Sequence, residues 1–135
     1  MGRPRGRRPV LTRFEDVQQI AQELCRLRNA KAVLLFGSHA RDEQNALSDV
    51  DLCVVGPLSA RERAEALAYS SDNLDISIFR DLPISIRFRI VQEGKPLAIK
   101  DRDYLDDERY KTIQEYLDFK PVIDKYVREV LRAER

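Results

Sequence analysis

The chain has 135 residues, and its 24 Lys and Arg nearly balance its 23 Asp and Glu, which gives a formal net charge of +1. This length suits one domain, and 43% hydrophobic residues are enough for a core, which excludes a disordered chain. The near-zero charge excludes whole-protein electrostatic attraction to nucleic acid or a membrane surface, and no apolar run is long enough to span a bilayer. We therefore expect neither direct nucleic-acid binding nor membrane association.

Residues 1–9 contain four arginines, two glycines and two prolines and no acidic residue. We expect them to form a disordered basic tail, followed by a single domain over residues 10–135. The tail contains no apolar segment of the kind found in a secretory leader. Cys25 and Cys53 lie in apolar runs, which is typical of buried free thiols. These features together predict a cytoplasmic protein.

A helix and two buried strands are predicted in the first half of the chain. Thr12 and Glu15 have the spacing of a capping box, and apolar residues then recur with the helical period as far as Leu27. The continuous apolar runs at residues 32–36 and 52–55 each stop at a glycine. Short runs of this kind are typical of strands that are buried on both faces.

The middle of the chain predicts two helices and two further strands. Ser59 is a favourable N-cap for a helix over residues 60–70, and the strict alternation of residues 74–79 predicts a strand. Pro83 and Gly94 would begin and end another helix. Residues 96–99 can form only a short edge strand, because Pro96 cannot donate to a ladder. The inward face of the helix that follows Ser59 is expected to hold Ala64, Leu67 and Ala68.

Residues from about 103 to 133 predict a helical C-terminal arm that Pro121 should break or kink. A heptad-like seam runs along this arm, and packing of the seam on the chain's own sheet is the default interpretation. Val122, Val127 and Leu131 widen the apolar face, which favours a partner helix or a dimer. The whole pattern predicts an α/β (α+β) fold with a small mixed sheet and flanking helices. The seam consists of Tyr116, Phe119, Ile123, Tyr126 and Val130.

The candidate functional residues lie between the two buried strands. Asp49 and Asp51 are two residues apart at the start of the second strand, so they project to the same side. Paired carboxylates suit Mg²⁺, and two such ions can promote in-line displacement at phosphorus. Gly37 lets the backbone approach a phosphate, Ser38 adds a hydroxyl and a backbone N–H, and Arg41 can neutralise phosphate charge.

A third acid is needed if the attacking group is a hydroxyl that must lose a proton. Asp75 is the candidate, because it alternates with apolar residues in the next strand and points out of the core. The three carboxylates would converge if this strand neighbours the Asp49–Asp51 strand. His39 is interpreted as a loop residue near the nucleotide and not as the base, since three acids are available.

Gly37-Ser38, ten residues, Asp49-x-Asp51 and then Asp75 resemble the signature of the polymerase-beta nucleotidyltransferase superfamily. The form GSHAR…SDVDL is similar to the minimal members, the MNT proteins, and the chain from about 14 to 133 resembles MNT antitoxins paired with HEPN toxins. The resemblance implies transfer of AMP from ATP to a hydroxyl of a HEPN ribonuclease toxin. It implies Asp49 and Asp51 as Mg²⁺ ligands, Asp75 as third acid and ligand, and Gly37 and Ser38 at the triphosphate.

Two alternatives stay open beside this antitoxin interpretation. One is the same chemistry on a small hydroxylated substrate such as an aminoglycoside, and the other is a non-catalytic antitoxin that blocks its toxin by binding. One departure from the resemblance is Asp42, since relatives often have glycine after the position of Arg41. Asp42 puts a negative charge near the expected phosphate site, and this charge can change the orientation of Arg41.

Overall fold

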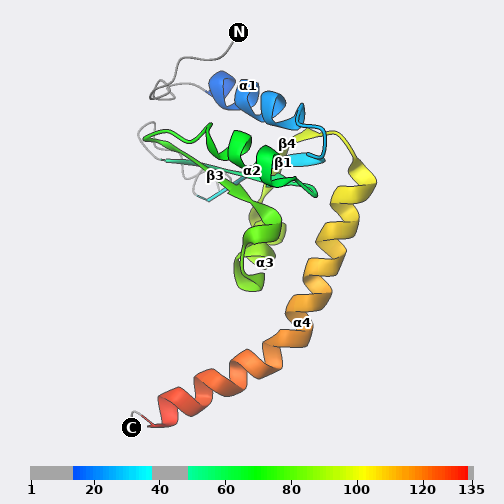
Figure 1. The fold of residues 1–135 in the computed structure, drawn as a ribbon. Coiled ribbons are helices and arrows are strands. Elements are labelled where there is room, and N and C mark those ends of the chain that lie inside the picture. The colour runs from blue at the N-terminus through cyan, green and yellow to red at the C-terminus, as the bar shows by residue number, and fades with distance from the viewer. Residues whose placement is uncertain (1–13, 38–48, 134–135) are drawn as a thin grey trace.

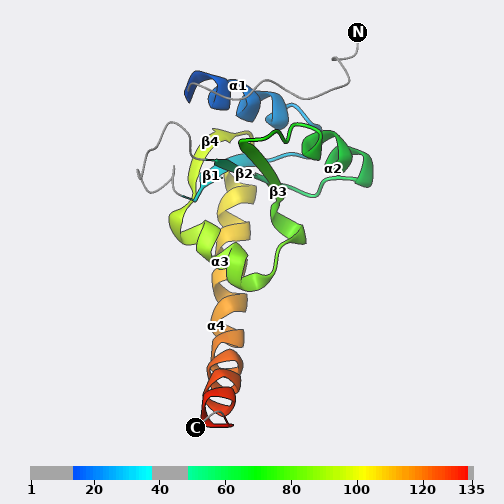
Figure 2. The same cartoon turned by 90° about the vertical axis from the view of Figure 1, so that its left-hand side faces the viewer.

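The computed structural model describes residues 14–37 and 49–133 of this chain. Its four strands form one sheet in the order β3-β2-β1-β4, and helices lie on both faces of that sheet (Figures 1 and 2). Strand β1 is antiparallel to β2 and β4, whereas β2 and β3 are parallel, so the expected mixed α/β fold is confirmed. In chain order the elements are α1 (Phe14–Cys25), β1 (Ala32–Phe36), β2 (Val50–Val55), α2 (Ala60–Leu67), β3 (Leu74–Ile78), the 3₁₀ turn η1 (Phe79–Asp81), α3 (Ile84–Glu93), β4 (Lys95–Ile99) and α4 (Arg102–Ala133).

The two central strands are apolar because both of their faces are covered. On one face, Leu35 and Leu52 pack with Leu24 of α1. On the other face, Leu34 and Cys53 pack with residues of η1, α3 and α4. Since alternate side chains of a strand point to opposite faces, a continuous apolar run is what this position requires. The predicted strands at 32–36 and 52–55 are confirmed, and β2 begins two residues earlier than its apolar run.

Helix α2 begins as predicted, but its buried face is not the predicted one. The Ser59 hydroxyl accepts from the Glu62 backbone N–H at 3.2 Å, and the Glu62 carboxylate accepts from the Ser59 N–H at 3.0 Å. The same carboxylate accepts two bonds from Asn29, from the backbone at 3.0 Å and from the amide at 2.7 Å. These bonds lower the pKa of Glu62 to about 2, with the backbone bond from Ser59 contributing most.

The expected inward face of α2 is wrong, because Ala64, Leu67 and Ala68 are exposed and Ala66 is the fully buried residue. Arg63 forms a two-bond pair with Asp81 of η1, with both N–O distances at 3.0 Å. Together with the Asn29 bonds, this pair fixes the rotation of the helix. Its partners come from distant segments, so the apolar pattern of the helix alone did not reveal the orientation.

Helix α4 continues through Pro121, so of the two expected outcomes, a break or a kink, the break is wrong and a bend is seen (Figure 1). Proline cannot donate to the carbonyl of Leu117, and the ribbon bends in its orange part while the helix goes on. With 32 residues, α4 is about 48 Å long at 1.5 Å per residue, so it extends far past the sheet. None of the helices described in 14–37 and 49–133 is long and apolar enough to cross a membrane.

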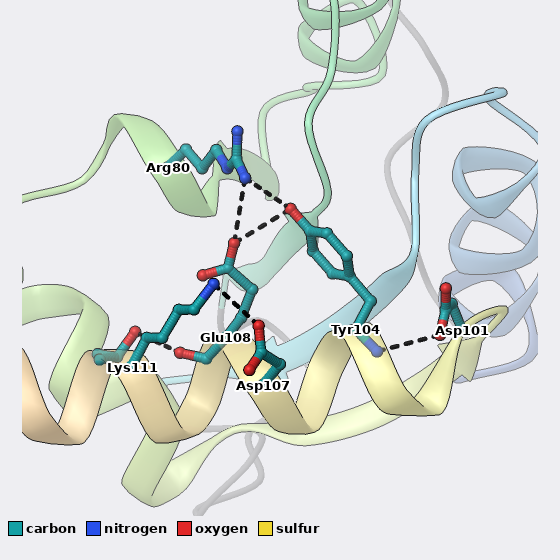
Figure 3. Close-up of polar contacts among 7 residues, drawn as sticks. Arg80, Asp101, Tyr104, Asp107, Glu108 and Lys111 are labelled. Atoms are coloured by element: carbon teal, nitrogen blue, oxygen red, sulfur yellow. Dashed lines mark hydrogen bonds and ion pairs between the residues drawn. The ribbon is translucent and has the colours of Figure 1, made fainter.

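The first half of α4 is attached to the body of the domain by polar and aromatic contacts. Arg80 of η1 donates to the Tyr104 hydroxyl at 2.8 Å and to Glu108 at 3.4 Å, and Tyr104 donates to Glu108 at 3.1 Å (Figure 3). Further along, the rings of Phe88 and Tyr116 stack with centroids 3.9 Å apart. Beyond this stack the arm is exposed, so the default interpretation that it packs on its own sheet is wrong for residues 117–133.

Candidate active site

One end of the sheet brings together the segments that carry the candidate residues. Because β1 and β2 are antiparallel, β1 ends where β2 begins, and β3 begins at the same end because it is parallel to β2. Gly37 follows β1, Asp49 precedes β2, and Asp51 and Asp75 lie near the starts of their strands. Strands β2 and β3 are therefore neighbours in the sheet, which is the condition under which we expected the acids to converge.

Asp51 and Asp75 are direct register partners across the β2–β3 pair. Directly opposed residues of neighbouring strands point to the same face, and adjacent strands lie about 4.8 Å apart. Their strand neighbours Leu52 and Ile76 are buried, with 0% and 4% exposure. A one-residue slip of register would turn these apolar side chains outward, so the core fixes the side to which both carboxylates point.

Gly37 lies against the carboxylate of Asp51. Its φ is +83°, a left-handed conformation that glycine adopts at little cost. A Cβ built on Gly37 would lie 2.6 Å from Oδ2 of Asp51, closer than any ordinary contact. The Asp51 carboxylate can therefore take this position only because residue 37 has no side chain.

The carboxylates remain accessible from solvent. Asp49 and Asp75 are exposed and Asp51 is half-buried. Asp51 shares its face of the sheet with Cys53, which is fully buried beneath α3 and α4. Burial raises the pKa of the Cys53 thiol, so this group stays protonated and chemically inert. Among the described residues at this end of the sheet, the carboxylate oxygens of the three aspartates are therefore groups that can bind a cation from solvent.

Several sequence-predicted site residues lie outside the described residues, namely Ser38, His39, Arg41 and Asp42. Within 14–37 and 49–133, no three His, Cys, Asp or Glu side chains stand close enough to form a metal-binding group. The described part of the site is a pair of aspartates in register, Asp49 two residues before one of them, and a glycine packed against the Asp51 carboxylate. Mg²⁺ is commonly held in this way, by one or two carboxylates together with phosphate oxygens of the substrate. The donor set therefore fits Mg²⁺ that arrives with a nucleotide.

The contact between Gly37 and Asp51 was not predicted from the sequence. The sequence indicated Gly37 only as a place where a phosphate can approach the backbone, and Asp51 only as a Mg²⁺ ligand. A glycine directly after a buried strand, at a position where the chain must turn, signals a positive φ. That signal marks the turn, but the identity of the side chain that fills the space beside it depends on the β1–β2 register.

Comparison with known proteins gives three consistent results. The sequence profile described as "Polymerase beta, Nucleotidyltransferase" matches residues 18–103. A protein of Methanocaldococcus jannaschii, whose name describes it as a candidate protein adenylyltransferase, is 34% identical over 79 residues, which are 58% of this chain and 63% of that protein. This chain thus matches less than two thirds of the length of that relative.

Solved structures with the same fold include chains of toxin–antitoxin complexes. One, a toxin–antitoxin with AMP-PNP, superposes with a TM-score of 0.68 at 24% identity and covers 84% of this chain and 98% of its own. Another, a tri-AMPylated Shewanella oneidensis HEPN toxin in complex with an MNT antitoxin, superposes with a TM-score of 0.61 at 20% identity. The match covers 87% of this chain and 94% of that chain. At these identities the likeness establishes the fold.

Proposed function

This chain belongs to the polymerase beta nucleotidyltransferase family, and from this premise we propose that it transfers AMP from ATP to a hydroxyl group of a cognate HEPN-type toxin. The toxin would be the helical protein encoded by the adjacent reading frame, and both proteins would act in the cytoplasm as an antitoxin and its target. The proposal is supported by the M. jannaschii relative, whose name describes a protein adenylyltransferase. It is also supported by the fold shared with a complex that contains an AMPylated HEPN toxin.

The observation that carries the proposal is the register pairing of Asp51 with Asp75 beside Gly37. Nucleotidyl transfer needs carboxylate oxygens that neutralise phosphate charge through Mg²⁺, and it needs room for the triphosphate against the backbone. Two carboxylates on one face provide the first requirement. A glycine at the end of the adjoining strand, packed beside the Asp51 carboxylate and without a side chain of its own, supports the second, because it leaves the backbone there uncovered by a Cβ.

Each residue of the site has a role in the proposed reaction. The acceptor hydroxyl oxygen attacks the α-phosphorus of ATP, a new P–O bond forms, the bond to the β-phosphate oxygen breaks, and pyrophosphate leaves with the electron pair. Asp75 accepts the proton of the attacking hydroxyl. Asp49 and Asp51, with Asp75, would hold two Mg²⁺ ions, which when bound supply charge neutralisation at the phosphates. Gly37, Ser38 and Arg41 would hold the triphosphate.

The exposed arm favours a protein acceptor over a small one. Large apolar side chains of α4 face solvent beyond residue 116, a surface that monomers rarely present. Association with the toxin, or assembly with further copies, would cover this surface through the C-terminal helix. The same surface is the observation that favours the second candidate function, a non-catalytic antitoxin that neutralises the toxin by binding alone.

The experiment that separates these functions is intact-mass spectrometry of the toxin after incubation with this chain, ATP and Mg²⁺, beside an assay of the toxin's ribonuclease activity. We expect the toxin to gain AMP and to lose activity, and an Asp49→Asn/Asp51→Asn double variant to do neither. Neutralisation by the double variant without any gain of mass would establish the binding-only antitoxin. Labelling of an added aminoglycoside, with the toxin unlabelled, would establish the small-molecule enzyme.

A further inference from the structure

The second half of α4 leaves the body of the domain with an uncovered apolar surface. Its base is fixed by the Phe88–Tyr116 stack and by the Arg87–Glu115 ion pair at 2.9 Å. Figure 1 shows the following turns extending away from the sheet. Six of their side chains, which we call the distal stripe, are 38–68% exposed: Val122, Ile123, Tyr126, Val127, Val130 and Leu131.

The distal stripe is wider than the contact face of a two-helix seam. Val122 and Leu131 are nine residues apart, and at 3.6 residues per turn they lie about 180° apart around the helix. The other four side chains of the stripe fall within that half-circle, and Lys120 is the one polar side chain of residues 117–133 inside it. A single partner helix covers a seam of about two positions in seven, so it would leave one edge of the stripe exposed.

The helix itself needs this cover. Residues 117–133 form a segment of 17 positions that contains Pro121, and most of the stability of helices in proteins comes from packing of their apolar face. Charge does not identify the partner, because four basic residues and three acidic ones are mixed along the segment and Lys120 pairs with Asp124 within it. Recognition of this surface therefore rests on apolar packing against the whole half-circle.

We propose that the distal stripe docks between two adjacent helices of one partner protein, so that the Val122 edge contacts one helix and the Leu131 edge contacts the other. Resting on the proposed function, that partner is the helical toxin encoded beside this chain. A symmetric pair of α4 helices from two copies would bury the central seam through Ile123 and Val130 and leave both edges in water. The breadth of the stripe thus argues against a simple α4–α4 pair and fits a helical hairpin, which the proposed function assigns to the toxin.

The test compares single substitutions on the two edges with one on the opposite face. Val122→Asp and Leu131→Asp each place a charge at one edge, and Lys125→Asp, about 150° from the stripe centre, is the matched control. Binding of the adjacent-gene protein is measured by calorimetry. We expect each edge variant to weaken the affinity at least tenfold and the control to change it less than twofold, because a charge buried without a partner is costly.

Any one of the following results would overturn the proposal. The first is loss of affinity at one edge only, which indicates a single-helix seam. The second is a wild-type chain that sediments alone as a dimer and becomes a monomer in both edge variants, which indicates a second copy as the occupant. The third is unchanged affinity in both edge variants, or an adjacent reading frame that encodes no helical protein.

Failure of the proposed docking surface and failure of the proposed AMP transfer give different results in these experiments. Edge-dependent binding without any gain of mass in the partner supports the docking surface and contradicts the enzymatic function. AMP transfer by the wild type, with equal affinity in all variants, supports the enzymatic function and contradicts the docking surface. At saturating partner concentration, edge variants that dock through the stripe should still transfer AMP, because their carboxylate site is unchanged.

Discussion

Replacing Gly37 by alanine tests whether the space beside Asp51 is part of the active site. The new Cβ would lie 2.6 Å from Oδ2 of Asp51, so the carboxylate must retreat by about 0.8 Å to reach an ordinary separation of 3.4 Å. Alanine also has to adopt the left-handed conformation at φ +83°, at a cost of roughly 1–2 kcal/mol. The variant should therefore fold, with a thermal midpoint lowered by roughly 4–8 °C.

The effect on catalysis should be much larger than the effect on stability. A displacement of about 1 Å in a catalytic group can cost on the order of a hundredfold in rate. We expect Gly37→Ala to lower the initial rate of AMP transfer to the toxin by about that factor, when rates are measured below the unfolding transition. The displaced group is the end of a side chain, so the loss comes from the site and not from the backbone of the sheet.

Ser59→Ala is the matched control for this experiment. Loss of its helix cap costs about 1 kcal/mol, which is close to the cost at Gly37, but Ser59 follows the opposite end of β2. Its rate of AMP transfer should equal that of the wild type. If Gly37→Ala is folded and transfers AMP at the wild-type rate, the contact with Asp51 has no role in catalysis and this reasoning is wrong.

Three further predictions concern the body of the domain. Glu62→Gln should lower the thermal midpoint above pH 4.5, because the hydrogen bonds that depress the pKa of Glu62 stabilise its charged form. The difference in midpoint between variant and wild type should shrink as the pH falls towards 2, and a difference that is equal at all pH values would contradict this. Ile90 is the buried residue of α3, at 1% exposure, and Ile90→Ala should lower the free energy of unfolding in urea by about 2–5 kcal/mol. A loss below about 1 kcal/mol would mean that neighbouring side chains fill the cavity left by the substitution. With maleimide under native conditions, half-buried Cys25 should react before buried Cys53, and the reverse order would show that the sheet opens locally.

Those parts of the fold that depend on nearby residues could be predicted from the sequence. The runs 32–36 and 52–55 are apolar because both faces of the central strands are covered, and that pattern is visible without a structure. Ser59 and Gly94 mark helix ends through contacts within a few residues. Sequence pattern also showed that Asp51 and Asp75 alternate with core residues, although it left open whether their strands are neighbours.

The features that could not be predicted depend on contacts between distant segments. The inward face of α2 is set by Asn29 and Asp81, which lie far from the helix in sequence. The arm is exposed beyond Tyr116 because the contact between α3 and α4 reaches only as far as the stack of Phe88 on Tyr116. The apolar periodicity of α4 does not indicate where that contact ends. The contact of Gly37 with Asp51 follows from the register of β1 on β2.

In the proposed reaction, this end of the sheet transfers the α-phosphate of ATP with its adenosine. The decisive experiment incubates the chain and its toxin with Mg²⁺ and ATP that is labelled either at the α- or at the γ-phosphate. We expect the toxin to take up the α-label alone, and Asp51→Asn, which keeps the shape of the side chain, to abolish this uptake. Incorporation of the γ-label, or of the α-label by the Asp51→Asn variant at the wild-type rate, would contradict the proposed reaction.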